Sequence, residues 1–325
     1  MNTAALRKNR IRLVFMAAFA VVLSVVYMVY GVKFDSQVLF VYSMKIRTPK
    51  LFAMVITGFA IGSASIVFQS IINNTIVTPC LLGMDALYTL IHTAVVFIAG
   101  AGSALAVNPE YSFVIDLSLM GVTATVVYSY LFKKTKHNVL YVLLVGTVLT
   151  SFFSSIQNTL TRIMDPNEYD TLLTTLVASF NNMNTSIMLL SVIVLAVTAF
   201  ALRKELRILD VLTLGKDQAV NLGVDYDSSV RKLLLGVTLY IAVATAMVGP
   251  LAFLGLIVAN LSRQLLNTYR HCYLILGSAF FGMIVLVGGQ IVVERVFSYT
   301  IPVSVFITLF GGIYFLHLLL SKRRV

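Results

Sequence analysis

The chain has 325 residues, of which 59% are apolar, and its mean hydropathy is +0.93. These values lie far above those of an ordinary soluble domain, so the composition excludes a soluble protein and predicts residence in a lipid bilayer. The formal net charge of +11 is typical of basic loops retained in the cytoplasm, and we expect no nucleic-acid partner.

Ten apolar segments are candidates for crossing the bilayer. A helix needs about 20 mostly apolar residues to span roughly 30 Å of hydrocarbon, and the runs are unbroken instead of alternating at every second residue. The sequence therefore predicts an all-α fold, a polytopic membrane helical bundle of about ten transmembrane helices that forms a single domain over residues 1–325. The predicted spans are 13–31, 51–72, 81–105, 113–132, 139–163, 187–202, 233–250, 252–266, 273–296 and 301–320.

The basic start of the chain, residues 7–12, precedes the first apolar run and is also a feature of signal peptides. No small-residue cleavage site follows cleanly, so we predict an uncleaved first span that starts in the cytoplasm. Alternation then puts most basic loop residues inside: Lys133, Lys134, Lys136, Arg203, Lys204, Arg207, Lys216, Arg231, Lys232, Arg270, Lys322, Arg323 and Arg324. Outer loops are acidic or neutral around Glu110 and 165–170. The pattern favours an even number of spans, with both termini on the cytoplasmic side of a bacterial cell membrane.

The segment between the first two spans breaks this charge rule. It carries Lys33, Lys45, Arg47 and Lys50, although it is predicted to face outside. Basic residues on the translocated side have no retention role, which favours a docking surface for an acidic partner. A snorkelling flank at the start of a helix is the alternative interpretation.

Motifs for ATP hydrolysis and metal chemistry are missing from the sequence. No Gly-x-x-x-x-Gly-Lys-Ser/Thr phosphate loop occurs, so we expect no ATP hydrolysis by this chain. The histidines lack the His-Glu-x-x-His spacing of a zinc site, and there is no Cys-x-x-Cys pair. We therefore predict no catalytic residue and no metal site. The scattered histidines are His92, His137, His271 and His317.

A carrier coupled to an ion gradient normally needs ionisable groups near the middle of the bilayer. The candidates within spans, Asp85, Asp116 and Arg162, all lie within a turn or two of a predicted span end. This placement favours a driving force supplied by a separate ATPase.

One long polar loop, predicted at about 203–232, offers a handle for such an ATPase. Within it lies Leu214-Gly-Lys-Asp-Gln-Ala-Val-Asn-Leu-Gly-Val-Asp225. We predict that Asp217 and Gln218 cap and open a short helix and that Gly223 ends it. The apolar side of this helix would consist of Ala219, Val220 and Leu222. The alternative is an interfacial helix on the membrane surface, where Lys216 and Arg231 would suit anionic headgroups.

A second segment, Gly249-Pro-Leu-Ala-Phe-Leu-Gly-Leu-Ile-Val-Ala-Asn-Leu-Ser-Arg263, follows one span later. Pro250 removes a backbone donor, while Gly249 and Gly255 permit close approach of neighbouring helices. We predict a bend there, either beside the transport pathway or as a purely structural kink.

Together these two segments resemble the FecCD family, the membrane permeases of ABC importers for iron–siderophore, haem and cobalamin. Further similarity lies in Arg47-Thr-Pro-Lys50, in Gln69 through Gly83, in Gln290 through Arg295 and in Ile301 through Phe315. The likeness covers roughly residues 45–320 and is weakest between 100 and 200. Ala259 and Asn260 stand where the family has Pro-His, and Thr75 stands where it has Pro.

The resemblance implies roles for three sets of residues. The residues that couple to the ATPase would be Leu214, Gly215, Gln218, Ala219, Leu222 and Gly223. The residues that dock a substrate-binding protein would be Arg47, Lys50 and Arg295. Candidates for pathway or gating residues are Gln69, Asn74, Pro79, Gly249, Pro250 and Asn260.

The function implied by the resemblance is that of a permease subunit that translocates an iron–siderophore-type chelate. Its expected partners are a second permease subunit, identical or homologous, two ABC ATPase subunits that bind ATP and Mg²⁺, and an extracytoplasmic substrate-binding protein. No cofactor is expected on this chain itself. The alternatives are a divalent-metal ABC permease, which would need His or carboxylate ligands, and an ion-coupled secondary transporter. The sequence does not identify the chelate.

Overall fold

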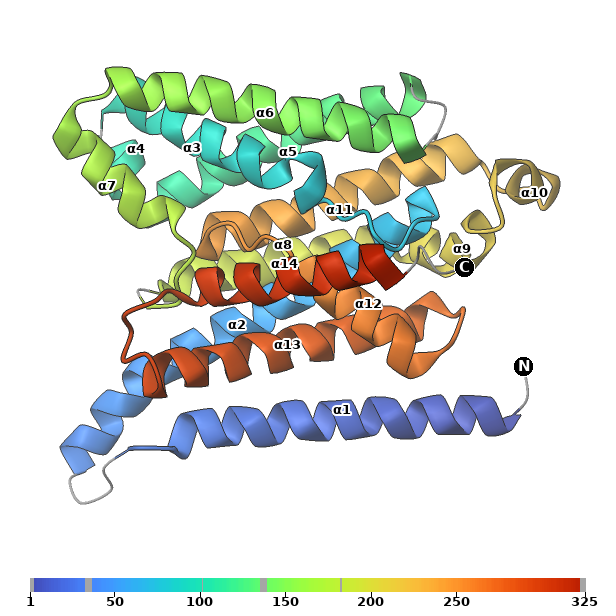
Figure 1. The fold of residues 1–325 in the computed structure, drawn as a ribbon, viewed down its shortest axis with the longest axis horizontal. Helices are drawn as coiled ribbons and strands as arrows, with labels where there is room; N and C mark the ends of the chain where they lie inside the picture. The colour runs from blue at the N-terminus through green and yellow to red at the C-terminus, as the bar shows by residue number, and fades with distance from the viewer. Residues whose placement is uncertain (1–2, 33–36, 101, 135–138, 182, 322–325) are drawn as a thin grey trace.

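The computed structural model describes residues 3–32, 37–100, 102–134, 139–181 and 183–321, and every regular element in these ranges is a helix (Figure 1). The α-helices are α1 (Thr3–Val29), α2 (Gln37–Ile72), α3 (Met84–Ala99), α4 (Ala104–Val107), α5 (Pro109–Lys134), α6 (Val139–Ile163), α7 (Pro166–Leu176), α8 (Thr185–Ala201), α9 (Arg203–Leu212), α10 (Lys216–Asn221), α11 (Tyr226–Val248), α12 (Leu254–Leu266), α13 (His271–Arg295) and α14 (Val303–Ser321). A 3₁₀ turn, η1 (Cys80–Leu82), precedes α3. Some residues of the charge and histidine patterns lie outside the described residues: Lys33, Lys136, His137, Lys322, Arg323 and Arg324.

The predicted spans correspond to helices in the described part of the chain. Six helices, α1, α2, α5, α6, α11 and α13, are long and apolar enough to cross a membrane. The pair α8 and α9 passes the same test together but is bent by 59°, and α3, α12 and α14 are shorter apolar helices. The prediction of an all-α membrane bundle is confirmed, and each of the ten predicted segments coincides with one of these helices.

Three helices, α1, α2 and α11, begin at least seven residues before the predicted spans, and α1 begins at Thr3. α2 begins at Gln37, so Arg47 and Lys50 lie inside a helix instead of at its start. α11 begins at Tyr226, because the Asp225 side chain accepts a hydrogen bond from the Ser228 backbone N–H at 3.2 Å and caps the helix. Hydropathy detects only the apolar part of a helix, so polar helix ends that project from the hydrocarbon are missed.

The long helices run roughly along one axis of the molecule (Figure 1). α1 begins and α14 ends at the same end as α10, and α7 lies at the opposite end. We call the end with α10 the inner end and the end with α7 the outer end. This arrangement matches the predicted alternation of spans, whereas the orientation of the bundle in the membrane stays a prediction.

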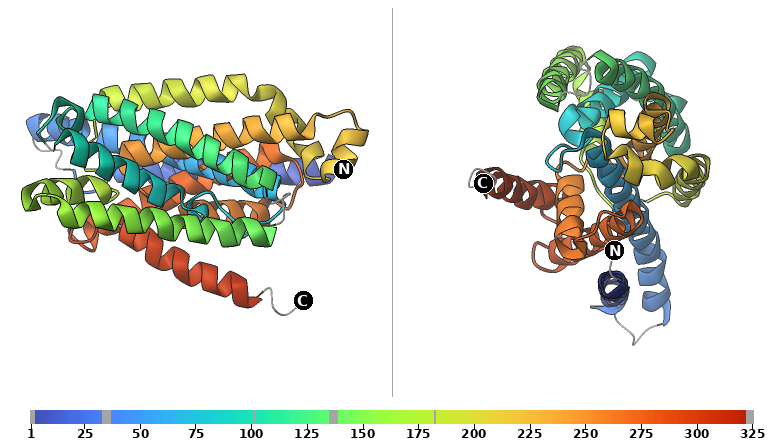
Figure 2. Two further views of the ribbon diagram at one scale, coloured as in Figure 1. Left: turned by 90° about the horizontal axis from the view of Figure 1, so that it is seen from above. Right: turned by 90° about the vertical axis from the view of Figure 1, so that its right-hand side faces the viewer.

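The centre of the bundle is built around α2 and α11, which are the most buried of the long spans. α2 and α13 pack backbone against backbone, since a Cβ added to Gly58 would lie 2.7 Å from the Met283 nitrogen and one added to Gly282 would lie 2.6 Å from the Gly58 oxygen. The Ser278 hydroxyl donates to the Gly62 carbonyl at 3.0 Å. Small residues thus bring these helices together, as is common in membrane bundles. α14 lies at one side of the bundle (Figure 2), where a Cβ at Gly311 would lie 2.5 Å from the Phe253 Cβ.

Candidate functional site

The short helix α10 projects from the inner end and is set off from the bundle by two glycines. Gly215 precedes it with φ 100° and Gly223 follows it with φ 80°. The Val224 N–H donates to the Ala219 carbonyl at 3.0 Å and the Gly223 N–H donates to the Val220 carbonyl at 2.9 Å, the two bonds of a Schellman motif. Neither glycine has an atom near its Cβ position. They are needed for their left-handed backbone and not for space.

One side chain anchors α10 to the bundle, whereas several side chains in α10 and beside it are exposed. Ala219 is completely buried, whereas Leu214, Val220 and Leu222 are 52%, 52% and 63% exposed. The predicted apolar side is therefore split, because Ala219 faces the bundle while Val220 and Leu222 remain uncovered. The predicted cap is wrong: Gly215 is the N-cap residue, it makes no side-chain hydrogen bond, and the helix opens at Lys216.

Ion pairs connect α9 and α10 to the long helices. The Lys216 ammonium donates to both Asp227 oxygens, at 3.0 and 2.7 Å, and this hydrogen bonding raises the pKa of Lys216. The Lys232 ammonium donates to Glu205 at 2.9 Å, which ties α9 to α11. The predicted loop at 203–232 therefore consists of two short helices, α9 and α10, and the first turns of α11.

At the outer end, the predicted docking arginines lie on one surface and already have hydrogen-bonding partners. Arg47 donates to the carbonyls of Tyr27 at 2.7 Å, Met28 at 3.2 Å and Tyr30 at 2.9 Å, and so caps the end of α1. Arg295 is exposed, donates to the same Tyr30 carbonyl and lies 5.0 Å from the Tyr30 ring centre.

Lys50, the third predicted docking residue, is only 6% exposed. Its ammonium donates to the Asn181 side-chain oxygen at 3.1 Å and lies 5.3 Å from the centre of the Tyr299 ring. Nearby, Glu294 accepts from the Tyr27 hydroxyl at 3.1 Å. The outer cluster therefore joins α1, α2 and α13, and a role in docking stays a prediction.

Three of the pathway candidates meet around the chain that leaves α2 at the inner end. The Thr75 carbonyl accepts from the side-chain amides of Gln69 at 2.7 Å and Asn260 at 2.9 Å. The Asn74 side chain accepts from the Ile76 N–H at 2.8 Å. Gln69 and Asn260 thus supply donors to non-helical backbone, which must be satisfied internally at membrane depth. Pro79, the fourth candidate in this region, is the N-cap residue of η1.

The other two candidates, Gly249 and Pro250, lie at the outer end, where α11 stops. Gly249 has φ 101°, and a Cβ there would lie 2.8 Å from the Cα of Ala178. The Ser179 N–H donates to the Val248 carbonyl at 3.0 Å in the same place. A Cβ at Gly255 would lie 2.1 Å from the Ser65 hydroxyl. The predicted close approach of a neighbouring helix is confirmed at Gly255, which meets α2, whereas Gly249 meets the non-helical residue Ala178. The break between α11 and α12 is the predicted bend.

With this geometry in place, comparison with known proteins decides the family. The model of the FecCD transport family matches residues 11–321. This chain belongs to the FecCD transport family.

Two curated relatives are similar over most of their length. The petrobactin import system permease protein YclO of Bacillus subtilis is 42% identical over 283 residues, which cover 87% of this chain and 90% of the relative. The petrobactin import system permease protein FatC of Bacillus anthracis is 35% identical over 287 residues, which cover 87% and 80%. A solved metal-chelate type ABC transporter in an inward-facing conformation shares the fold, with a TM-score of 0.79 at 20% identity over 96% of this chain and 99% of the other.

In this FecCD permease, sequence reasoning missed a buried ionisable pair near the outer end. His92 Nδ1 lies 2.7 Å from an Asp116 carboxylate oxygen, and His92 Nε2 lies 3.0 Å from the Thr175 hydroxyl. The pair lines a cavity of about 550 Å³ between α3, α5, α7, α8 and α11. Each residue was visible as an ionisable group in an apolar segment. Their pairing was not visible, since they come from different helices.

Proposed function

We propose that this chain is the membrane-spanning subunit of an ABC importer that carries a ferric siderophore of the petrobactin type into the cytoplasm. The proposal includes separate ATPase subunits, a second permease subunit and an extracytoplasmic binding protein. Membership of the FecCD family and the printed function of the two petrobactin relatives support it. The single observation that carries the ATPase-driven mechanism is α10, where Leu214, Val220 and Leu222 are exposed on a segment braced against the bundle.

Motion of the ATPase subunits would enter the bundle at α10. An ATPase groove that covers the exposed leucines removes apolar surface from water, which favours association. Because Ala219 is buried and Lys216 is paired with Asp227 of α11, a displacement of α10 would be passed on to α11. α11 then crosses the bundle to the break at Gly249. A displacement at the inner end is thereby transmitted to the outer end through one rigid helix.

The coupling role of α10 is tested by comparing a variant of one exposed leucine with a variant of the residue beside it. Leu222→Asp should weaken association with the ATPase by about tenfold or more, because it puts a charge into an apolar contact. Asn221→Asp is the matched control, since Asn221 is exposed on the same helix and receives the same charge. Co-purification and ATPase stimulation are measured, together with the amount of permease in the membrane. Equal behaviour of the two variants would remove the coupling role of α10.

Two transport alternatives are separated by uptake assays. Uptake of labelled ferric petrobactin should continue when proton and sodium gradients are collapsed while ATP is maintained. Loss of uptake under this condition would favour an ion-coupled carrier. Excess free divalent metal should not compete with the chelate, and strong competition would favour a divalent-metal permease.

A further inference from the structure

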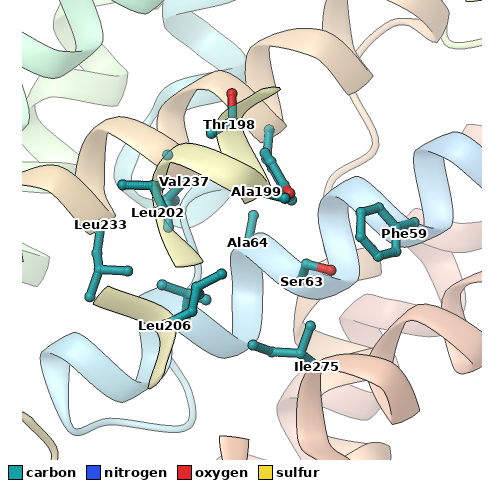
Figure 3. A pocket seen from close by; sticks show the side chains of 13 residues that line it. Phe59, Ser63, Ala64, Thr198, Ala199, Leu202, Leu206, Leu233, Val237 and Ile275 are labelled. Carbon is teal, nitrogen blue, oxygen red and sulfur yellow. The ribbon is translucent and has the colours of Figure 1, made fainter. Parts of the chain in front are cut away.

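A groove on the side of the bundle lies where α8 meets α9 (Figure 3). Its volume is about 100 Å³, and its walls come from α2, α8, α9, α11 and α13. Apolar side chains form most of the lining, among them Phe59, Ala64, Leu202, Leu206, Leu233 and Ile275.

The groove opens on an apolar face of the bundle. Phe59, Ala199 and Ile275 in its lining are partly exposed. On the adjoining face of α8, Val197 is 63% exposed and Phe200 is 69% exposed. A face of this composition on a membrane span is one that meets lipid hydrocarbon.

The sequence builds this groove by a bend and a missing side chain. Leu202 ends α8 and begins α9, at the 59° bend. A Cβ at Gly236 on α11 would lie 2.1 Å from a Leu202 methyl carbon, so the glycine makes room for Leu202. α9 is held across the inner end of the groove by Glu205, which is paired with Lys232 as described above, and by Asp210, which accepts from the His271 N–H at 3.0 Å. The groove is therefore preformed.

Two arginines of α9 lie next to lining residues of this groove. Arg203 and Arg207 each follow a lining leucine by one residue, lie one helical turn apart and are exposed. The Arg203 guanidinium lies 4.6 Å from the centre of the Phe200 ring, beside the lipid-facing surface. Among the described residues, neither arginine has a carboxylate partner within salt-bridge distance. Two unneutralised cations thus adjoin an apolar groove at the end of the bundle that the charge pattern assigns to the cytoplasm.

We propose that the groove binds a segment of one acyl chain of an anionic phospholipid whose phosphate is held by Arg203 and Arg207. An apolar chain in the groove and an anion at the neighbouring cations satisfy both features, as in basic lipid sites between membrane helices. An apolar helix of a partner protein would fill the groove but leave the cations without counterions. The lining of the groove includes none of the predicted pathway residues and none of the predicted coupling residues.

The test uses the absence of tryptophan from the sequence. Phe59→Trp introduces a single reporter in the groove, and Ile275→Trp provides a second reporter on another wall. The purified full chain is reconstituted in phosphatidylcholine vesicles, and brominated-chain phosphatidylglycerol or phosphatidylcholine is titrated in. Quenching by the anionic lipid should occur at about tenfold lower content than quenching by the neutral lipid. Val197→Trp, on the exposed face of α8, should be quenched equally by both.

The headgroup contact is tested by Arg203→Gln combined with Arg207→Gln in each reporter background. This pair of changes should reduce the tenfold preference to near unity, whereas Lys134→Gln, which removes an exposed cation from α5, should leave it unchanged. Native mass spectrometry of the Trp-free chain provides a second measurement, in which bound phosphatidylglycerol should be retained by the unchanged chain and lost from the double variant. Absence of quenching at both reporters, equal quenching by the two lipids, or a preference that survives the double change would each overturn the proposal.

Discussion

Two glycines decide the shape of the coupling segment at the scale of single residues. Gly215 and Gly223 have positive φ and no neighbours at their Cβ positions, so their only structural role is to allow a left-handed backbone. The sequence predicts correctly that Gly223 follows the helix, because a glycine after a short amphipathic stretch is a known C-terminal signal. The start was predicted wrongly, since Asp217 resembles a cap residue but lies in the first turn.

Gly223→Ala should loosen this turn while leaving the bundle folded. An alanine in the left-handed region costs about 1 kcal/mol, so amide exchange at residues 223 and 224 should accelerate by about fivefold. Hydrogen exchange with mass spectrometry measures this effect. Gly102→Ala is the control, because Gly102 has no neighbour within 4 Å and no positive φ. Equal exchange at residues 223 and 224 in the two variants would contradict the assignment of Gly223 to the left-handed turn.

Arg295→Gln tests docking at the outer cluster. Exposed ion pairs contribute about 0–1 kcal/mol, so affinity for the binding protein should fall by up to about fivefold at low salt, and the difference should shrink at high salt. Arg162→Gln removes another exposed arginine, at the outer end of α6, and should have a smaller effect. Affinity is measured by surface plasmon resonance at two salt concentrations. An unchanged affinity at low salt would contradict a docking role for Arg295 and leave its contact with Tyr30 as its role.

Helix packing, at the scale of elements, rests on contacts that hydropathy does not reveal. The backbones of α2 and α13 touch at Gly58 and Gly282, and the Ser278 hydroxyl reaches Gly62. Gly58 and Gly62 form a small-x-x-x-small pair that is visible in the sequence, whereas its partner helix is not. The bend between α8 and α9 is also only partly visible in the sequence. The sequence predicts a span end there, but it does not predict the groove that the bend creates.

Gly282→Ala should destabilise the bundle, because the added carbon would lie 2.6 Å from the Gly58 oxygen and force the helices apart. Overpacking of this kind costs about 1–3 kcal/mol, which should lower the thermal unfolding midpoint in detergent. Gly288→Ala on the same helix is the matched control, since its nearest atom, a Leu23 methyl carbon, lies at an ordinary 3.8 Å. Because alanine favours a helix more than glycine does, Gly288→Ala should leave the midpoint unchanged or raise it slightly. A Gly282→Ala midpoint no lower than that of Gly288→Ala would contradict close packing at Gly282.

Topology, at the scale of the whole molecule, follows from the distribution of charge among the loops. The inner end, with α9 and α10, is rich in Lys and Arg, and the outer end contains α7 with Glu168 and Asp170. The positive-inside rule therefore predicts that the inner end faces the cytoplasm.

Labelling with an impermeant maleimide measures this orientation. Cys272 is exposed at the start of α13 near the inner end, so it should react in inverted vesicles and not in intact cells. Asp170→Cys, in a Cys80→Ser and Cys272→Ser background, should react in intact cells. The reverse pattern would invert the bundle and place α10 outside, away from any cytoplasmic ATPase.

The sequence by itself determined that this protein is a bundle of membrane helices, because lipid provides no partner for backbone polar groups and allows only long apolar helices. It also located the segments around Leu214 and Gly249, since a polar island and a Gly-Pro break stand out against apolar surroundings. Only the tertiary structure decided which distant residues meet. His92 pairs with Asp116, and Asn260 donates to the Thr75 carbonyl, 185 residues away in the chain. Such pairings depend on the rotation and crossing of packed helices, which the hydropathy of each helix does not specify.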